Sequence, residues 1–385
     1  MTPRTRCPSS CTGTGTWWTR GALARIAFLT GVASCMCSGA SLVCNTGSSA
    51  AGSGATPAVA VVPKFPGSIA AAPHGGLYIA DAAGNEILER SASGSYSVIA
   101  GTGSPGLRGD GGPATRGELN GPGSLLPMSS GALYFVQTGT EKAKPGGLSD
   151  TVVREIAPTG VLRTVAGLHP SCPTDHAATA IPAESALMYG AGLSLGPGGV
   201  LEVTANPCPN VSALGPFLEL TVSGELRDNS PDRIGAASIS CADTTEGRGF
   251  AAFVCDSGGG ATAFGHPKEL LVVRSNGSTD AYPAYEDGPI AAGDGEVVAG
   301  YDYEVVRVTS DEISALVSTR ELVGLFSNSY GVAGVNGLSV DQHGDIFVVA
   351  SLYIRKEGCA AVILERAASG TLEKLWTSAA GQVCG

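Results

Sequence analysis

The chain repeats itself. Eight residues near the start of the folded region, ILERSASG at 87–94, return near the C-terminus as ILERAASG at 363–370, with one position changed. Internal repetition constrains a fold strongly, because each repeat unit has to bury its apolar faces against its neighbours. The two copies therefore predict a repeat architecture with similar units at its two ends.

Two turn signals accompany the repetition. The first is a glycine-containing turn that opens an apolar strand, and its six copies begin at Gly75, Gly131, Gly198, Gly247, Gly295 and Gly344. The second is expected between a third and a fourth strand, at Ser93-Gly94, Thr159-Gly160, Ser223-Gly224, Asn276-Gly277, Ser310-Asp311 and Ser369-Gly370. A small polar residue followed by glycine supplies the positive φ that tight hairpin turns need. The spacing predicts six units of four antiparallel strands.

The composition fits an all-β chain. Gly 56 and Pro 23 are high and charged residues, at 15%, are few, as expected of short strands joined by tight turns. The runs between the turns are short, and no segment with helical periodicity interrupts them. We predict an all-β fold, a six-bladed β-propeller of four-stranded antiparallel blades, over residues 65–385. A β-sandwich has no reason to repeat a four-strand unit six times, and the coils of a β-solenoid are shorter.

The first 44 residues are of another kind. They contain four arginines and no acidic residue, with a mildly apolar run at 26–44. This pattern is typical of an export signal, so we expect a secreted or cell-surface protein. Val32-Ala33-Ser34-Cys35 resembles a lipobox, whose cysteine is lipidated, whereas Ser38-Gly39-Ala40 would suit ordinary cleavage equally well. An uncleaved signal anchor is a third alternative. Residues 45–64 are rich in Ser, Gly and Ala and are predicted to be a flexible linker.

The charge of the remaining chain limits its partners. Without residues 1–44 the chain has 19 basic and 34 acidic side chains, a net charge of −15. Such a surface repels phosphate backbones, so nucleic acid is not an expected partner. An acidic surface could collect Ca²⁺ or another divalent ion, although solubility is the simpler reason for it. No other cofactor is expected, and the protein is expected to be a monomer.

Six cysteines remain outside the predicted export signal: Cys172, Cys208, Cys241, Cys255, Cys359 and Cys384. An even number in an exported protein favours disulfides. None of these cysteines has the CxxC spacing of a zinc or redox site, so thiolate metal binding is not expected.

Part of the chain resembles a known family. The segments GTG at 101–103, GDGGPAT at 109–115 and GPG at 121–123, with Leu119 between the last two, resemble the inter-blade signature of NHL-repeat propellers. The resemblance is particularly to bacterial members and to the NHL region of teneurins, and it is specific over residues 65–123. A second, more divergent copy is read as Val165-Ala166-Gly167, with ATA at 178–180 and Leu187 downstream. Beyond about residue 231, only the turn spacing supports the resemblance, which implies an NHL-like propeller.

Propeller topology then assigns the connections to faces. In a four-stranded blade, the connection between strands two and three leaves from the same face as the crossing to the next blade. The longest crossings, 104–120 and 168–187, are therefore expected on that face. Cys172 and Cys208 would brace it, and Cys359 could reach Cys384 and pin the last blade, where a propeller otherwise closes by recruiting an N-terminal strand. Cys241 and Cys255 flank a hairpin without being obviously opposite.

The candidate ligand-binding residues lie in these crossings: Arg108, Asp110, His169, Asp175 and His176. Asp110 stands in Gly109-Asp110-Gly111, where a carboxylate either accepts from the backbone amides of a tight loop or coordinates a cation. His74 and His343 occupy equivalent turns and His266 precedes a proline, and all three are interpreted as structural.

No catalytic residue is assigned. The chain has no GxSxG, HExxH or GxxxxGK[ST] motif. The expected innermost strands, around 68–71, 193–195 and 338–340, are small and apolar, with Glu202 and Asn336 as isolated polar candidates. The sequence therefore favours a non-enzymatic, exported or surface-tethered NHL-like propeller that binds a protein, peptide or glycan ligand through its disulfide-braced loop face. A metal-assisted lyase, or a lactonase or other hydrolase of the propeller type, is the alternative, and a tethered structural or sensor domain is a third hypothesis.

Overall fold

The computed structural model describes most of the chain, which divides into two compact units, residues 1–60 and 61–385. The described residues are 23–28, 31–38 and 41–45 in the first unit, and in the second 61–139, 150–169, 171, 178–196, 199–207, 217–229, 241–247, 250–256, 268–274, 278–284, 289–292, 296–301, 303–309 and 312–378. None of the helices in these ranges is long and apolar enough to cross a membrane.

The first unit contains one small antiparallel sheet. Its strands pair in the order β1-β2-β3, and they are β1 (Leu23–Phe28), β2 (Gly31–Ser38) and β3 (Ser41–Asn45). The predicted export signal covers these strands, and its cleavage or lipidation at Cys35 stays a prediction.

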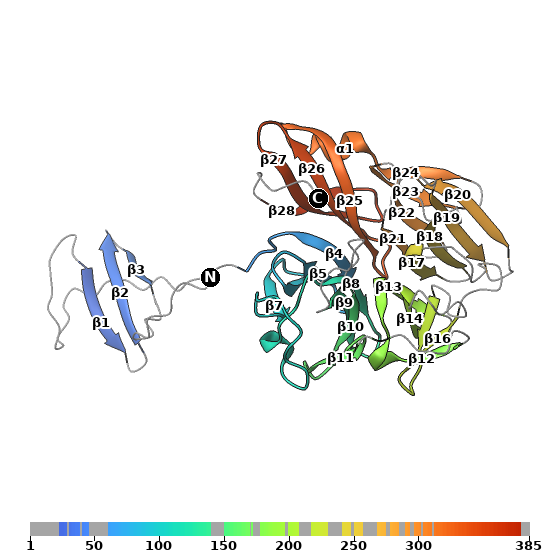
Figure 1. Ribbon diagram of the computed structural model, residues 1–385. Helices are drawn as coiled ribbons and strands as arrows, with labels where there is room; N and C mark the ends of the chain where they lie inside the picture. Colours follow the sequence, from blue (N-terminus) through green and yellow to red (C-terminus); the bar gives the residue numbers. More distant parts are fainter. Residues whose placement is uncertain are drawn as a thin grey trace. The chain divides into compact units, whose positions relative to one another are not determined.

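The second unit consists of six antiparallel sheets, which we number as blades one to six (Figure 1). Blade one is β4 (Pro66–Ala71), β5 (Gly76–Asp81), β6 (Glu86–Ser91) and β7 (Tyr96–Ala100). Blade two is β8 (Gly123–Pro127), β9 (Leu133–Thr138), β10 (Thr151–Ile156) and β11 (Leu162–Ala166). Blade three is β13 (Met188–Gly196), β14 (Val200–Pro207), β15 (Phe217–Leu220) and β16 (Glu225–Asp228).

The later blades follow the same order. Blade four is β17 (Cys241–Gly247), β18 (Phe250–Asp256), β19 (Lys268–Arg274) and β20 (Thr279–Ala284). Blade five is β21 (Ile290–Ala292), β22 (Val297–Tyr301), β23 (Glu304–Val308) and β24 (Ile313–Val317). Blade six is β25 (Ser329–Val340), β26 (Ile346–Ile354), β27 (Gly358–Arg366) and β28 (Leu372–Thr377). The predicted six-bladed propeller of four-stranded antiparallel blades is confirmed.

Two additions to the repeat were not predicted. Blade three has a fifth strand, β12 (Ala180–Pro182), at its outer edge beside β16. The expectation of no helical segment is wrong at α1 (Thr319–Gly324), which joins blades five and six. Ser318 and Glu321 cap this helix reciprocally, so a capping box starts a helix too short to show apolar periodicity.

The core is divided among the blade interfaces. Among the described residues, five hydrophobic clusters each join two neighbouring blades: one and two, two and three, four and five, five and six, and six and one. The octapeptide copies lie on β6 and β27, the third strands of blades one and six, as predicted. Leu88 and Ile363 belong to the same cluster, so the two copies are packed side by side.

The ring closes without exchanging a strand. Each blade is built from consecutive strands, so no N-terminal strand completes the last blade. At the closing seam, β4 packs beside β25, and the Ala71 amide donates to Ser339 Oγ (2.8 Å). The amides of Leu125 and Leu193 likewise donate to Ser68 Oγ and Ser124 Oγ of the preceding blades. Serine hydroxyls thus accept hydrogen bonds from N–H groups at the inner edges of the sheets, where no partner strand is present.

The predicted disulfides fall partly outside the described residues. Cys359 is buried and disulfide-bonded. Cys172, Cys208 and Cys384 lie outside the described residues, so the predicted pairings of Cys172 with Cys208 and of Cys359 with Cys384 stay predictions. The backbone of Cys241 is directly opposite that of Cys255 in the β17/β18 ladder. Opposite residues in antiparallel strands have Cα atoms about 4.5–5.5 Å apart, which a disulfide can span.

Candidate functional site

The long crossings do not project from the loop face as expected. They run along the outer edge of the following blade and reach the opposite end of its last strand. Pro113 bridges to Val161 of blade two, and β12 pairs with β16 of blade three. Both partners directly follow the turn between strands three and four. The crossings therefore cover the outermost strand of a blade, which would otherwise expose unpaired backbone groups.

The structure also realigns the two copies of the crossing motif. Pro113 and Pro182 each precede a short 3-10 turn, Ala114–Arg116 and Ala183–Ser185, with nearly the same backbone angles. Gly101 donates to the Ala114 carbonyl, just as Gly167 donates to that of Ala183. The equivalent of PAT at 113–115 is therefore PAE at 182–184. The alignment of ATA at 178–180 with this motif is wrong. That match relied on similar residue types and did not include the proline that precedes the turn.

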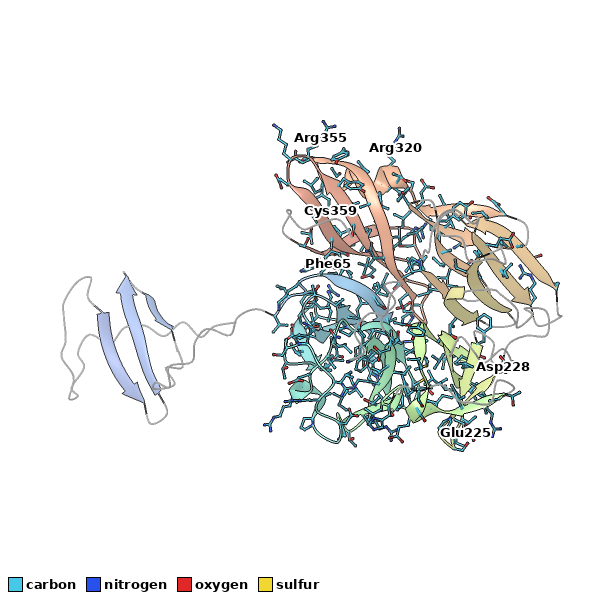
Figure 2. The ribbon with its side chains drawn as sticks, in the orientation of Figure 1. Phe65, Glu225, Asp228, Arg320, Arg355 and Cys359 are labelled. Atoms are coloured by element: carbon cyan, nitrogen blue, oxygen red, sulfur yellow. The ribbon has the colours of Figure 1, made fainter. Side chains whose placement is uncertain are left out.

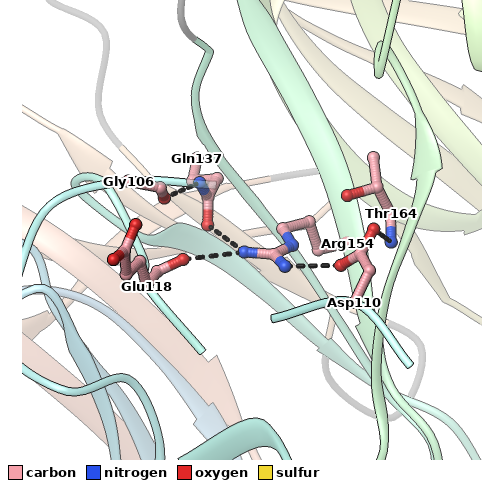
Figure 3. Close-up of polar contacts among 6 residues, drawn as sticks. All are labelled: Gly106, Asp110, Glu118, Gln137, Arg154 and Thr164. Carbon is pink, nitrogen blue, oxygen red and sulfur yellow. Dashed lines mark hydrogen bonds and ion pairs between the residues drawn. The ribbon is translucent and has the colours of Figure 1, made fainter. Parts of the chain in front are cut away.

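Asp110 holds the first crossing to blade two. Its Oδ1 accepts from Arg154 Nη2 (2.5 Å), and its Oδ2 accepts from the Thr164 amide (2.9 Å) (Figure 3). Arg154 lies on β10 and its side chain is fully buried, whereas that of Asp110 is 35% exposed. The carboxylate therefore compensates a buried guanidinium.

The remaining contacts of Arg154 also go to the crossing or its surroundings. Arg154 Nη1 donates to the Glu118 carbonyl (2.8 Å) and to Gln137 Oε1 (3.5 Å), and Gln137 Nε2 donates to the Gly106 carbonyl (3.0 Å) (Figure 3). Sequence reasoning missed Arg154, although a basic residue inside the apolar run Val152-Val153-Arg154 was a signal for a buried partner. This network supports the structural interpretation of Asp110.

The other predicted ligand residues are dispersed. Arg108 is exposed, and its carbonyl accepts from the Glu118 amide. His169 is 73% exposed, with Nε2 3.8 Å from Glu184 Oε1. Asp175 and His176 lie outside the described residues, as does His266. Within the described ranges, no group of three or more His, Cys, Asp or Glu residues could hold a metal ion.

Most of the described side chains that line the central channel are apolar, in agreement with the sequence-based prediction. A cavity of about 250 Å³ is lined by the inner strands of five blades, β4, β8, β13, β21 and β25. Among these described lining residues the polar side chains are Ser194 and Ser339, and none is ionisable. These described residues of five blades therefore include no general acid, general base or carboxylate metal ligand.

A larger cleft lies at the seam between blades one and six. It measures about 410 Å³ and is lined by the turns that carry His74 and His343. Asp341 Oδ1, also in the lining, accepts from the amides of His343 and Asp345. The pKa of Glu365 on β27 is raised, mainly by burial and to a smaller extent by the negative charge of Asp345. The backbone bonds of Asp341 agree with a structural role for this turn.

Glu202 is one of four buried carboxylates among the described residues, with Asp81, Asp150 and Glu155. Glu202 of β14 is 6% exposed and accepts from Asn229 Nδ2. Burial raises the pKa of Glu202, the hydrogen bond from Asn229 opposes this rise, and the charge of Glu219 adds to it. Asn336, the other isolated candidate, is exposed on β25.

Comparisons with known proteins identify no family for this chain. No protein-family model matches the chain, and no curated protein matches it. Among solved structures, a streptogramin B lyase is 13% identical, with 82% of this chain and 84% of that chain covered, at a TM-score of 0.45. A glucose dehydrogenase is 13% identical, with coverages of 75% and 94% and a TM-score of 0.46. A gluconolactonase from Xanthomonas campestris is 12% identical, with coverages of 75% and 84% and a TM-score of 0.43.

The three structures are named for different activities, and their TM-scores to this chain lie between 0.43 and 0.46. Identities of 12–13% do not carry an activity or a substrate from those proteins to this chain. The chemistry of the chain has to be argued from its own residues.

Proposed function

We propose that the protein is a non-enzymatic, NHL-like β-propeller that binds a protein, peptide or glycan ligand through the face bearing the connections between second and third strands. The observation that carries this proposal is the channel, where the described lining residues include no ionisable side chain. The inner strands of these five blades are therefore poorly suited to acid–base or metal-assisted catalysis.

The distribution of connection lengths supports the choice of face. The second and third strands are joined by 139–150 in blade two, 208–216 in blade three and 257–267 in blade four. The corresponding connections in blades five and six are only 302–303 and 355–357. Three consecutive blades thus carry the long connections on one face, and binding residues commonly lie on loops held by a rigid scaffold.

Shortening one long connection tests the assignment. We expect a variant in which residues 140–149 are replaced by a two-residue Asn-Gly turn to keep the wild-type melting temperature and to lose binding on an array of oligosaccharides and peptides. The control replaces residues 355–357 by the same turn and should bind normally. Turnover of lactone or ester substrates by the wild type and both variants, with added divalent ions, would contradict the proposal and favour the lyase or lactonase alternative.

We also propose that the protein is exported, with the segment up to residue 44 acting as its signal. The four arginines and the absence of acidic residues there support this. Mass spectrometry of the mature N-terminus is expected to show either cleavage near residue 40 or a lipidated Cys35. An unmodified N-terminus at Met1 on protein recovered from the cytoplasm would refute export.

A further inference from the structure

The two faces of blade three differ in character. Leu193, Val203, Leu218 and Leu226 pack with Val136 and Val153 of blade two. The alternate residues form a row across the strands, in which Ser194, Glu202, Glu219 and Arg227 are directly opposite one another in turn. Because side chains alternate between the faces of a sheet, this polar row lies on the face turned away from blade two.

That face is turned toward blade four. The strands β13 and β14 contact β17 of blade four. Each of the other five blade interfaces has a hydrophobic cluster, whereas no cluster made of described residues joins blades three and four. The polar row therefore lies on the face of blade three that contacts β17.

The centre of the row is a pair of like charges. Glu202 and Glu219 are opposite residues on neighbouring strands, and such side chains have Cβ atoms about 4.5–5.5 Å apart. Like charges in these positions repel each other, and the burial of Glu202 strengthens the repulsion. Arg227, next in the row, ion-pairs with Glu225 (2.7 Å), which Figure 2 shows at the outer edge of blade three. In the described part of blade three, no ion pair joins a basic side chain to Glu202 or Glu219.

Ser194 adds an oxygen that has no partner. It is opposite Glu202 on the channel side, is only 4% exposed, and its Oγ makes no hydrogen bond. The hydroxyls of Ser68, Ser124 and Ser339 on other inner strands each accept an amide of a neighbouring blade. A buried polar atom without a partner is uncommon in native proteins and calls for a ligand, an ion or water.

We propose that Glu202, Glu219 and Ser194 Oγ form a binding site for a divalent cation of the Ca²⁺ type on the inner half of blade three. Ca²⁺ prefers six to eight oxygen ligands, including carboxylates, amide carbonyls and water, in flexible geometry. The two carboxylates would supply the charge, and Asn229 Oδ1 is available as a neutral ligand if its amide rotates. Ser194 also lines the channel, so water and the ion can reach the site from there. The ion would offset the repulsion between the two carboxylates and would give Ser194 Oγ a partner.

Calorimetric titration and melting curves of the full chain, first stripped with chelator, test this site with CaCl2 as the probe. The wild type should bind with a Kd of about 1 mM or tighter, the range of extracellular calcium modules, and should melt at a higher temperature when Ca²⁺ is added. Glu202→Gln removes the repulsion and should melt above the chelated wild type, yet its Ca²⁺ affinity should fall at least about tenfold. Glu219→Gln should behave in the same way.

The matched control is Glu184→Gln. Glu184 is 69% exposed on the crossing to blade three, and its substitution should leave both the affinity and the calcium-induced stabilisation unchanged. The proposal is overturned if the wild type shows no Ca²⁺ binding, or if Glu202→Gln and Glu219→Gln bind Ca²⁺ as tightly as the wild type does.

Discussion

Replacing Asp110 with alanine is expected to lower the free energy of unfolding by about 3 kcal/mol, because it leaves the buried Arg154 guanidinium without its carboxylate. The Thr164 amide loses its acceptor in the same variant. Chemical denaturation followed by fluorescence measures the change. Glu184→Ala removes an exposed carboxylate from the other long crossing and should change the stability by less than about 0.5 kcal/mol.

A double substitution separates the contribution of the ion pair from that of the other contacts of the crossing. Replacing both Asp110 with Ala and Arg154 with Met should restore much of the loss, since an apolar side chain in the Arg154 position does not need a charge partner. If Asp110→Ala destabilises no more than Glu184→Ala, the network of Figure 3 does not hold the crossing.

Gly101→Ala is expected to destabilise the protein by about 4 kcal/mol, the sum of a strained backbone and a collision. Gly101 has a φ of +97°, and a Cβ there would lie 2.3 Å from the Asn85 carbonyl oxygen. Neither atom can move without disturbing the entry to the crossing, because the Gly101 amide donates to the Ala114 carbonyl.

Gly111→Ala isolates the backbone part of this effect. Its φ is +81°, and no atom lies within 4 Å of a Cβ built on it. We expect a loss of about 1 kcal/mol, the usual cost of placing an L residue in the left-handed region. Equal losses at Gly101 and Gly111, measured by denaturant unfolding, would show that the close approach at Gly101 is relieved at little cost.

The turn chemistry carried most of the fold prediction. Gly94, Gly160, Gly224 and Gly370, each expected in a turn between third and fourth strands, all have positive φ. A hairpin turn depends on a few adjacent residues, so its signal is present in a short stretch of sequence. The octapeptide was likewise assigned to third strands of the two end blades, and Leu88 and Ile363 meet in one cluster.

The path of the crossings could not be predicted in the same way. Topology indicates the face from which a crossing leaves, whereas its course depends on what it packs against. The contact of Asp110 with Arg154 joins residues 44 positions apart in the sequence. The residues around either one do not indicate its partner. The short helix at Thr319–Gly324 was missed for a related reason, since its single turn shows no apolar period.

The sequence by itself determined the repeat, the six four-stranded units and the apolar character of the inner strands, because these follow from local turn chemistry and residue type. Only the tertiary structure decided that the crossings cover outer edges, that Asp110 pairs with a buried arginine, and that Glu202, Glu219 and Ser194 share one face of blade three. These three features depend on strand register and on packing between distant segments. A register shift of one residue would turn each side chain of a strand to the other face of the sheet.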